Sequence, residues 1–216
     1  MSIPITRNKV SAQAEQAIRN NVRAIASINR PDGVARLVTP ADSDALLDFF
    51  SIPEVSGPIY TIEKPVTREN VAAHIREKRQ AQARGEGLLT AVFGEDGRIL
   101  SFMDHLIWPE WSAAEFGGAM RPERQSKGQG RAGIVSSIDW VFEVLGVNLL
   151  CFTAALDNQR SIRLIDAMGL RQMGEIISQG PNGTTRPSRV WEMTNAEWQE
   201  QKARLMHGDN RDQARQ

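Results

Sequence analysis

The chain has 216 residues, a length that favours one domain with at most a small extension. Lys plus Arg and Asp plus Glu each total 26, so the formal net charge is zero and no broad basic field is present to bind a nucleic-acid backbone. The hydrophobic fraction of 41% and the charged fraction of 24% exclude an intrinsically disordered chain.

Neither a membrane segment nor a metal site is predicted. No run approaches the roughly 18 consecutive apolar residues of a membrane helix, and the first ten residues lack the apolar stretch of a signal peptide, so we expect a cytoplasmic protein. The single cysteine, Cys151, excludes an intramolecular disulfide, and three histidines without a cysteine cluster exclude a thiolate zinc site. Cys151 lies in an apolar run, which predicts a buried thiol.

The first predicted element is a helical arm. Within residues 11–28, apolar side chains recur at helical spacing, at Ala14, Ile18, Val22 and Ile25. An isolated helix of this length is marginal in water, so we expect its apolar face to pack on the main domain or on a second subunit of a homodimer. We assign residues 1–33 to an N-terminal helical extension.

The main domain is expected to span residues 34–193 and to alternate strands with helices. In chain order we expect a strand at 34–38, helices at 40–50 and 67–83, strands at 88–93, 98–107 and 113–120, a helix at 128–145, a strand at 149–156, a helix at 161–168, and strands near 171–177 and 189–193. The three consecutive strands form an antiparallel meander. This order predicts an α+β fold with a mixed, mostly antiparallel sheet flanked by helices. Residues 194–216 should form a helix to about residue 207 and then a disordered tail.

A glycine-rich loop, Gln125-Ser-Lys-Gly-Gln-Gly130, precedes the long helix and carries the sharpest signal in the sequence. Backbone amides in the first turn of a helix attract anions, and glycines leave those amides accessible. We expect the amides of residues 125–131 to bind a pyrophosphate. Lys127 and Arg131 could screen its charge or be ordinary surface cations.

Two nucleotide motifs are excluded by spacing. The four residues that separate the glycines of a P-loop are absent. Gly128, Gly130 and Gly133 match GxGxxG as a string, but no parallel strand precedes them and no acidic residue follows at the spacing of a dinucleotide site.

Three motifs occur in a fixed order. The loop pattern Q/R-x-x-G-x-G/A is filled by Gln125, Gly128 and Gly130. The strand pattern Glu-apolar-Gly-x-x-apolar-x-Pro is filled by Glu115, Phe116, Gly117, Met120 and Pro122. The helix start Asn-x-x-Ser is filled by Asn158 and Ser161. From about residue 34 to residue 193 the chain therefore resembles the GNAT acetyltransferase superfamily, in particular its RimJ/RimL-like branch of ribosomal-protein N-acetyltransferases.

The resemblance implies acetyl-CoA as the co-substrate, with no metal. The implied contact residues are Met120, Gln125, Lys127, Gly128, Gln129, Gly130, Arg131, Asn158 and Ser161. Met120 would bind the pantetheine arm through its main chain and Asn158 through its side chain, while Asn158 and Ser161 could also simply cap a helix. The chain departs from the family in three places. Residues 125–130 differ from the Trp-Gly-Lys-Gly-Tyr-Ala of many branch members, and Gly118 stands where an aromatic residue is usual. Ile165 stands where many members have a tyrosine that protonates the leaving thiolate.

Glu115 is the candidate general base. Burial of a carboxylate in an apolar strand raises its pKa toward the range useful for accepting a proton; the alternative is a structural charge paired with an arginine. If the corner at 109–111 divides the two strands evenly, Asp104 lies opposite Glu115, which is the register we favour. With one more residue in the turn, His105 faces Glu115 instead. Asp104 and His105 are therefore the candidate helpers.

The predicted activity is acetyl-CoA-dependent N-acetylation. A primary amine, on a small molecule or a protein N-terminus, would attack the thioester directly, and residues 51–65 with the following helix would form the acceptor wall. The alternative is a catalytically silent GNAT fold that binds acyl-CoA as a sensor or interaction module, which the isoleucine at position 165 leaves open. We expect no nucleic-acid or membrane partner.

Overall fold

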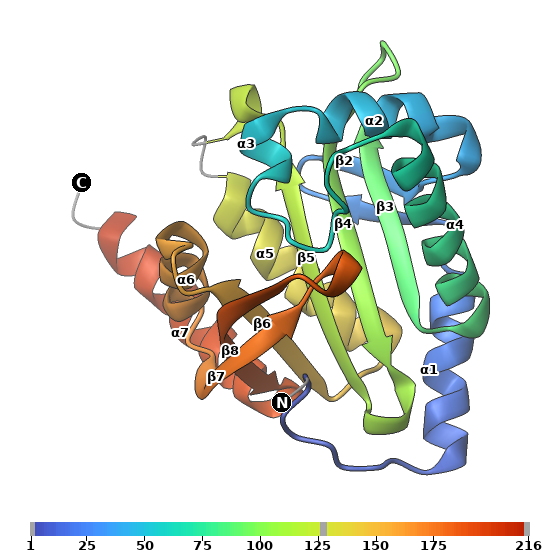
Figure 1. Ribbon diagram of the computed structural model, residues 1–216. Coiled ribbons are helices and arrows are strands. Elements are labelled where there is room, and N and C mark those ends of the chain that lie inside the picture. Colours follow the sequence, from blue (N-terminus) through green and yellow to red (C-terminus); the bar gives the residue numbers. More distant parts are fainter. Residues whose placement is uncertain (1–2, 126–128, 214–216) are drawn as a thin grey trace.

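One sheet runs through the computed structural model, which describes residues 3–125 and 129–213 (Figure 1). Its strands are β1 (Ser27–Arg30), β2 (Gly33–Leu37), β3 (Gly87–Phe93), β4 (Ile99–Trp108), β5 (Ala113–Met120), β6 (Leu149–Ala155), β7 (Arg171–Gln179) and β8 (Thr185–Thr194). The strand order is β1-β2-β3-β4-β5-β6-β8-β7, and neighbours are antiparallel except β5 and β6. The predicted mixed, mostly antiparallel sheet is confirmed.

Helices cover both faces of this sheet (Figure 1). They are α1 (Ala12–Ala24), α2 (Ser43–Phe50), α3 (Pro53–Ser56), α4 (Arg68–Arg84), α5 (Gln129–Trp140), α6 (Gln159–Ala167) and α7 (Asn195–Gln213). Short turns of other helical types lie at η1 (Pro40–Asp42), η2 (Pro109–Trp111), η3 (Pro122–Arg124), η4 (Val141–Leu145) and η5 (Pro181–Gly183). No helix within the described ranges is both long and apolar enough to cross a membrane.

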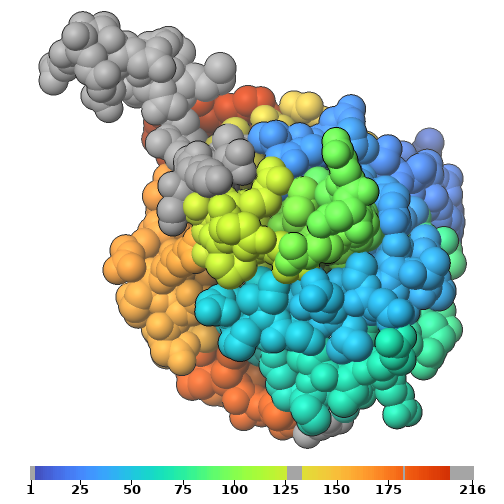
Figure 2. Space-filling model, turned by 90° about the horizontal axis from the view of Figure 1, so that it is seen from above, coloured from blue at the N-terminus to red at the C-terminus, as the bar shows by residue number. Residues whose placement is uncertain are grey.

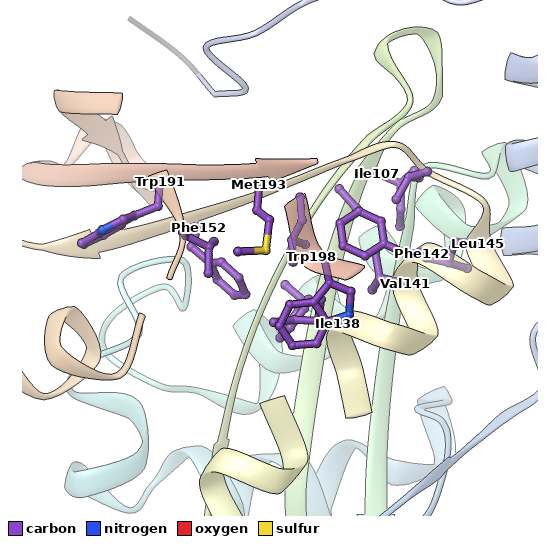
Figure 3. Packing of buried hydrophobic residues seen from close by; sticks show 14 of the residues in the cluster. Ile107, Ile138, Val141, Phe142, Leu145, Phe152, Trp191, Met193 and Trp198 are labelled. Carbon is purple, nitrogen blue, oxygen red and sulfur yellow. The ribbon is translucent and has the colours of Figure 1, made fainter. Parts of the chain in front are cut away.

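The two largest apolar cores lie on opposite faces of the sheet. Helices α2, α3 and α4 pack on one face, around Phe50, Ile75 and Phe102. Helices α1, α5, α6 and α7 contribute to the other core, where Phe152, Trp191 and Trp198 gather (Figure 3). The buried indoles keep their hydrogen bonds: Trp191 Nε1 donates to Asp166 at 2.8 Å and Trp198 Nε1 to Asp139 at 2.7 Å.

The N-terminal arm belongs to the second of these cores. Ile18 and Val22 of α1 are buried there, and Ile25 packs against it. The expected helix over residues 11–28 is too long, because α1 ends at Ala24 and residues 27–30 form β1. Pairing with β2 provides backbone hydrogen bonds that a helix of this short segment would lack.

The C-terminal helix also differs from its prediction. Helix α7 continues to Gln213, beyond the expected end at residue 207. Residues 208–213 are Gly, Asp, Asn, Arg, Asp and Gln, most of which disfavour helix, so local propensity does not explain the extension.

Strands β5 and β6 are paired along only part of their length, and we call the place where their backbones separate the opening between β5 and β6. The two strands pair in parallel only over residues 113–115 and 149–151. Beyond this point β5 keeps its antiparallel pairing with β4 as far as Met120. A Cβ at Gly118 would lie 2.4 Å from the carbonyl oxygen of Phe102, which explains why this position has no side chain.

Candidate active site

Glu115 lies at the base of this opening. It is the last residue of β5 that pairs with β6, where its partner is Cys151. Thr153 Oγ1, two residues further along β6, donates a hydrogen bond to Glu115 Oε1 at 2.7 Å. The carboxylate and the hydroxyl therefore join the two strands just where their backbones separate.

The surroundings of Glu115 raise its pKa to about 7, mainly through burial. The hydrogen bond from Thr153 lowers this pKa, the nearby Asp104 carboxylate raises it, and the Arg186 guanidinium lowers it. A carboxyl group with a pKa near neutrality exists in both forms at pH 7, so it can accept a proton and release it again.

Both predicted registers for β4 and β5 are wrong. Glu115 faces Leu106, while Asp104 faces Gly117 and His105 faces Phe116. The turn takes up Pro109–Trp111 and also Ser112, which adopts a left-handed conformation with φ +47°. This larger turn displaces the strands relative to each other by one or two residues.

Asp104 still shares the sheet face of Glu115, two residues away along β4. Side chains alternate along a strand, and a diagonal neighbour of this kind lies about 7–8 Å away between Cα atoms. Lys78 of α4 forms a buried ion pair with Asp104 Oδ1 at 2.7 Å. The nearby His74 has a pKa lowered by burial, so it is neutral at pH 7.

His105 is on the opposite face of the sheet from Glu115. Its ring lies 5.9 Å from Phe116 and 5.4 Å from Trp140 between centroids, within the α5 side. Burial, helped by Arg30, lowers its pKa to about 3. The structure therefore separates His105 from Glu115, in contrast to its expected place beside the base.

Tyr60, in the loop between α3 and α4, reaches the site although its sequence position gave no sign of this. Arg186 of β8 places its guanidinium carbon 3.7 Å from the centre of the Tyr60 ring. Glu115 is close enough to raise the pKa of Tyr60, and the Thr153 hydroxyl acts on it in the opposite direction. Of Tyr60, Arg186 and Thr153, only Thr153 could have been noticed in the sequence, because it is a hydroxyl residue within an apolar strand.

Gln125 ties the start of the glycine loop to two other elements. Its Nε2 donates to the Met120 carbonyl at 2.9 Å, and its Oε1 accepts from Arg160 of α6 at 2.7 Å. The loop therefore starts next to the end of β5 and the start of α6. Figure 2 shows the end of β5 in yellow-green bordering the orange segment and the cyan segment that contains α3.

The rest of the loop is only partly described. Lys127 and Gly128 lie outside the described residues. Gln129, Gly130 and Arg131 form the first turn of α5, where backbone amides have no partner within the helix.

Asn158 and Ser161 form the start of α6. The Asn158 side-chain oxygen accepts a hydrogen bond from the Ser161 amide at 3.1 Å, so Asn158 is the N-cap.

A cavity of about 150 Å³ lies between the loop after α3, helix α4 and η5. Its lining includes Thr61, Glu63, His74, Glu77 and Pro181. Residues 51–65 and α4, which we expected to form the acceptor wall, thus border this cavity. The carboxylates of Glu63 and Glu77 and the imidazole of His74 line it. Among the described residues, no group of His, Cys, Asp and Glu could hold a metal ion.

Comparison with known proteins gives one family and many similar structures. The model of the acetyltransferase (GNAT) domain family matches residues 34–171. No curated protein matches significantly.

Three solved structures illustrate the likeness in fold. The ribosomal-protein-S5-alanine acetyltransferase of Vibrio fischeri has a TM-score of 0.64 at 16% identity, over 81% of this chain and 99% of that one. RimJ of Mycobacterium smegmatis, in complex with CoA-disulfide, gives 0.62 at 16%, over 79% and 87%. The spermidine N-acetyltransferase of Vibrio cholerae, with CoA and spermine, gives 0.61 at 16%, over 76% and 96%.

The matched segment begins in β2 and ends in β7, and it includes Glu115 and the opening between β5 and β6. The chain belongs to the GNAT acetyltransferase family and is an N-acetyltransferase.

Proposed function

We propose that this protein transfers the acetyl group of acetyl-CoA to a primary amine, and that Glu115 is the general base. The observation that carries this proposal is the position of a carboxyl group with a pKa near 7 at the point where β5 and β6 separate. A base at that point would meet an amine on one side of the opening and a thioester within it.

Acetyl-CoA would be held mainly by the backbone. The first turn of α5 offers free amides to the pyrophosphate, and residues 125–131 would surround it, including Lys127, Gly128 and Arg131. The pantetheine arm would extend β5 at Met120 and approach Asn158 and Ser161 at the start of α6. The hydrogen bonds of Gln125 to Met120 and Arg160 support this placement, because they hold the three segments together.

The chemistry proposed is direct attack. Glu115 would accept the proton of the amine, directly or through water, and the amine nitrogen would attack the acetyl carbonyl carbon. Cys151 is a poor nucleophile, because burial and the nearby Glu192 raise its pKa far above its usual range. The site therefore favours one transfer step over a covalent acetyl-enzyme. Fixing both reactants in one cleft would supply much of the acceleration.

The acceptor is proposed to be a small-molecule amine or a protein N-terminal amine. Glu63 and Glu77 line the hollow between the loop after α3 and helix α4, which suits a positively charged group. The similar structures include proteins named for ribosomal-protein and for spermidine acetylation, so both kinds of amine belong in a test panel.

The test is release of free thiol from acetyl-CoA in the presence of polyamines, small amines and peptides with free N-termini. Acetylation of at least one amine, with the product confirmed by mass, is expected. CoA binding measured by calorimetry without turnover on any amine would favour the sensor alternative.

A further inference from the structure

Two adjacent glycines of β5 differ in why they have no side chain. A Cβ at Gly118 would lie 2.4 Å from the Phe102 carbonyl oxygen, so the backbone of β4 excludes it. A Cβ at Gly117 would meet no atom of the described residues within 4 Å, and this glycine does not have a positive φ. Glycine in a strand interior weakens the strand and often marks a place where a ligand approaches closely. The fold therefore gives no reason for Gly117, and a ligand would give one.

The open space at Gly117 lies on the same face of the sheet as Glu115. Strands β4 and β5 pair without a register shift over this stretch, so residues 115 and 117 point to the same side and lie about 7 Å apart between Cα atoms. Gly117 is exposed, and Glu115 is partly exposed. The missing side chain therefore leaves an approach to the Glu115 carboxylate from the direction of Gly117.

Two further side chains border this space. Asp104 is the partner of Gly117 across β4 and β5, and an ion pair with Lys78 at 2.7 Å holds its carboxylate in place. Ala119, the next residue of β5 on this face, packs against the apolar core that contains Phe102. A carboxylate on one side and an apolar wall on another suit an ammonium group on a hydrocarbon stem.

We propose that Gly117 is a specificity-determining residue, whose open space holds the carbon that bears the acceptor amine while the nitrogen lies at Glu115. This inference rests on the proposed acetyl transfer. The thioester would lie in the opening between β5 and β6, so the face of Glu115 is left for the amine. A side chain at position 117 would occupy the volume of that carbon and its substituents.

The acceptor class that needs this room is an amine on a branched carbon. A protein N-terminal amine is of this kind unless the first residue is glycine, because its carbon also bears a side chain. An amine on an unbranched chain needs less room, so it should tolerate a side chain at position 117 better.

The test compares wild type, Gly117→Ala and Gly117→Val on two matched pairs of acceptors. One pair is a peptide that begins with glycine and the same peptide beginning with alanine; the other is spermidine and 1-methylspermidine. Within each pair the acceptors differ by one methyl group on a carbon that bears a primary amine. Gly117→Ala should lower kcat/KM for the branched member by about tenfold or more, and for the unbranched member by less. Gly117→Val should lower both further, and the dissociation constant for CoA, measured by calorimetry, should stay the same.

A second readout separates a role in acceptor binding from a role in folding. Strands favour valine, and a glycine in a strand interior weakens it, so neither variant should melt below the wild-type temperature. The control is Gly133→Ala in α5, on the other side of the sheet, where a Cβ also has open space among the described residues. This control should leave the preference within each acceptor pair unchanged.

Four outcomes would overturn the inference. A lower melting temperature of Gly117→Ala would show that the fold requires this glycine. No loss, or an equal loss with both members of a pair, would show that Gly117 does not select the acceptor. A loss that depends on the length of the acyl group, compared between acetyl-CoA and butyryl-CoA, would assign the space to the donor. These three leave the proposed acetyl transfer standing, whereas a wild-type protein that acetylates no amine would overturn the proposed function as well.

Discussion

The two sides of the opening are built differently. On the side of α5 and α6, the groups offered to a ligand are mainly backbone amides and helix caps, as at Asn158. Around Glu115 of β5 and Tyr60 of the loop between α3 and α4, they are side chains with charges or labile protons. Backbone groups are suited to binding a cofactor that is the same in every reaction. Side chains are suited to transferring protons and to selecting the acceptor amine. Changes on the first side should therefore affect affinity for CoA, and changes on the second should affect turnover.

The largest effect is expected from removing the N-terminal arm. Both sides of the opening are built on the same sheet, so a loss of stability in this sheet would affect both. A chain that starts at Pro31 loses Ile18 and Val22 from the core and the amides of Ile5 and Thr6 from the buried Glu192 carboxylate. The melting temperature should fall by many degrees, and Ile18→Ala alone should cost about 2–5 kcal/mol of unfolding free energy. Thermal melts and urea titrations measure both. An unchanged melt would mean that the arm is a loose extension.

Glu115→Gln should separate turnover from affinity. Loss of the base should lower turnover by about 10²-fold or more, because glutamine has a similar shape but cannot accept the proton. The dissociation constant for acetyl-CoA, measured by calorimetry, should stay the same. Full activity of this variant at every pH would show that Glu115 is a structural charge.

A bulky residue at Gly130 should have the opposite effect. In the first turn of α5, a side chain would obstruct the approach of phosphate to the amides, so Gly130→Leu should raise the CoA dissociation constant by about tenfold or more. The matched control is Gly133→Ala in the same helix, where a Cβ meets no atom within 4 Å. Equal CoA affinity in both variants, each still folded, would remove the pyrophosphate site from this loop.

The smallest effects concern pH dependence. Since the pKa of Glu115 is about 7 and its ionised form is the proposed base, kcat/KM should rise with pH through about 7 and then level off. Asp104→Asn removes a negative charge that raises this pKa, so the midpoint should move down. Arg186→Gln removes a positive charge that lowers it, so the midpoint should move up, each by less than about one unit. Shifts of the same sign in both variants would contradict the assigned charges.

Within the meander of β3, β4 and β5, the bounds of the strands could be predicted from the sequence but their register could not. The bounds of β5 follow from its apolar pattern and the flanking corner, and the structure confirms them. Its register with β4 does not follow, because Ser112 adds a residue to the turn. The amides of Asn148 and Leu149 bind the Ser112 carbonyl at 2.8 and 3.0 Å, so a segment more than thirty residues away stabilises that turn.

The sequence by itself determined the strand and helix order apart from β1 and α3, the position of the glycine loop before α5 and the capping residue of α6. These features depend on contiguous residues, because periodicity, free amides and caps act within one or two turns of chain. Only the tertiary structure decided that His105 faces away from Glu115 and that Tyr60 and Arg186 join it. Arg186 and Pro58 are 128 positions apart, and no local pattern encodes which side chains meet when the sheet brings such distant segments together.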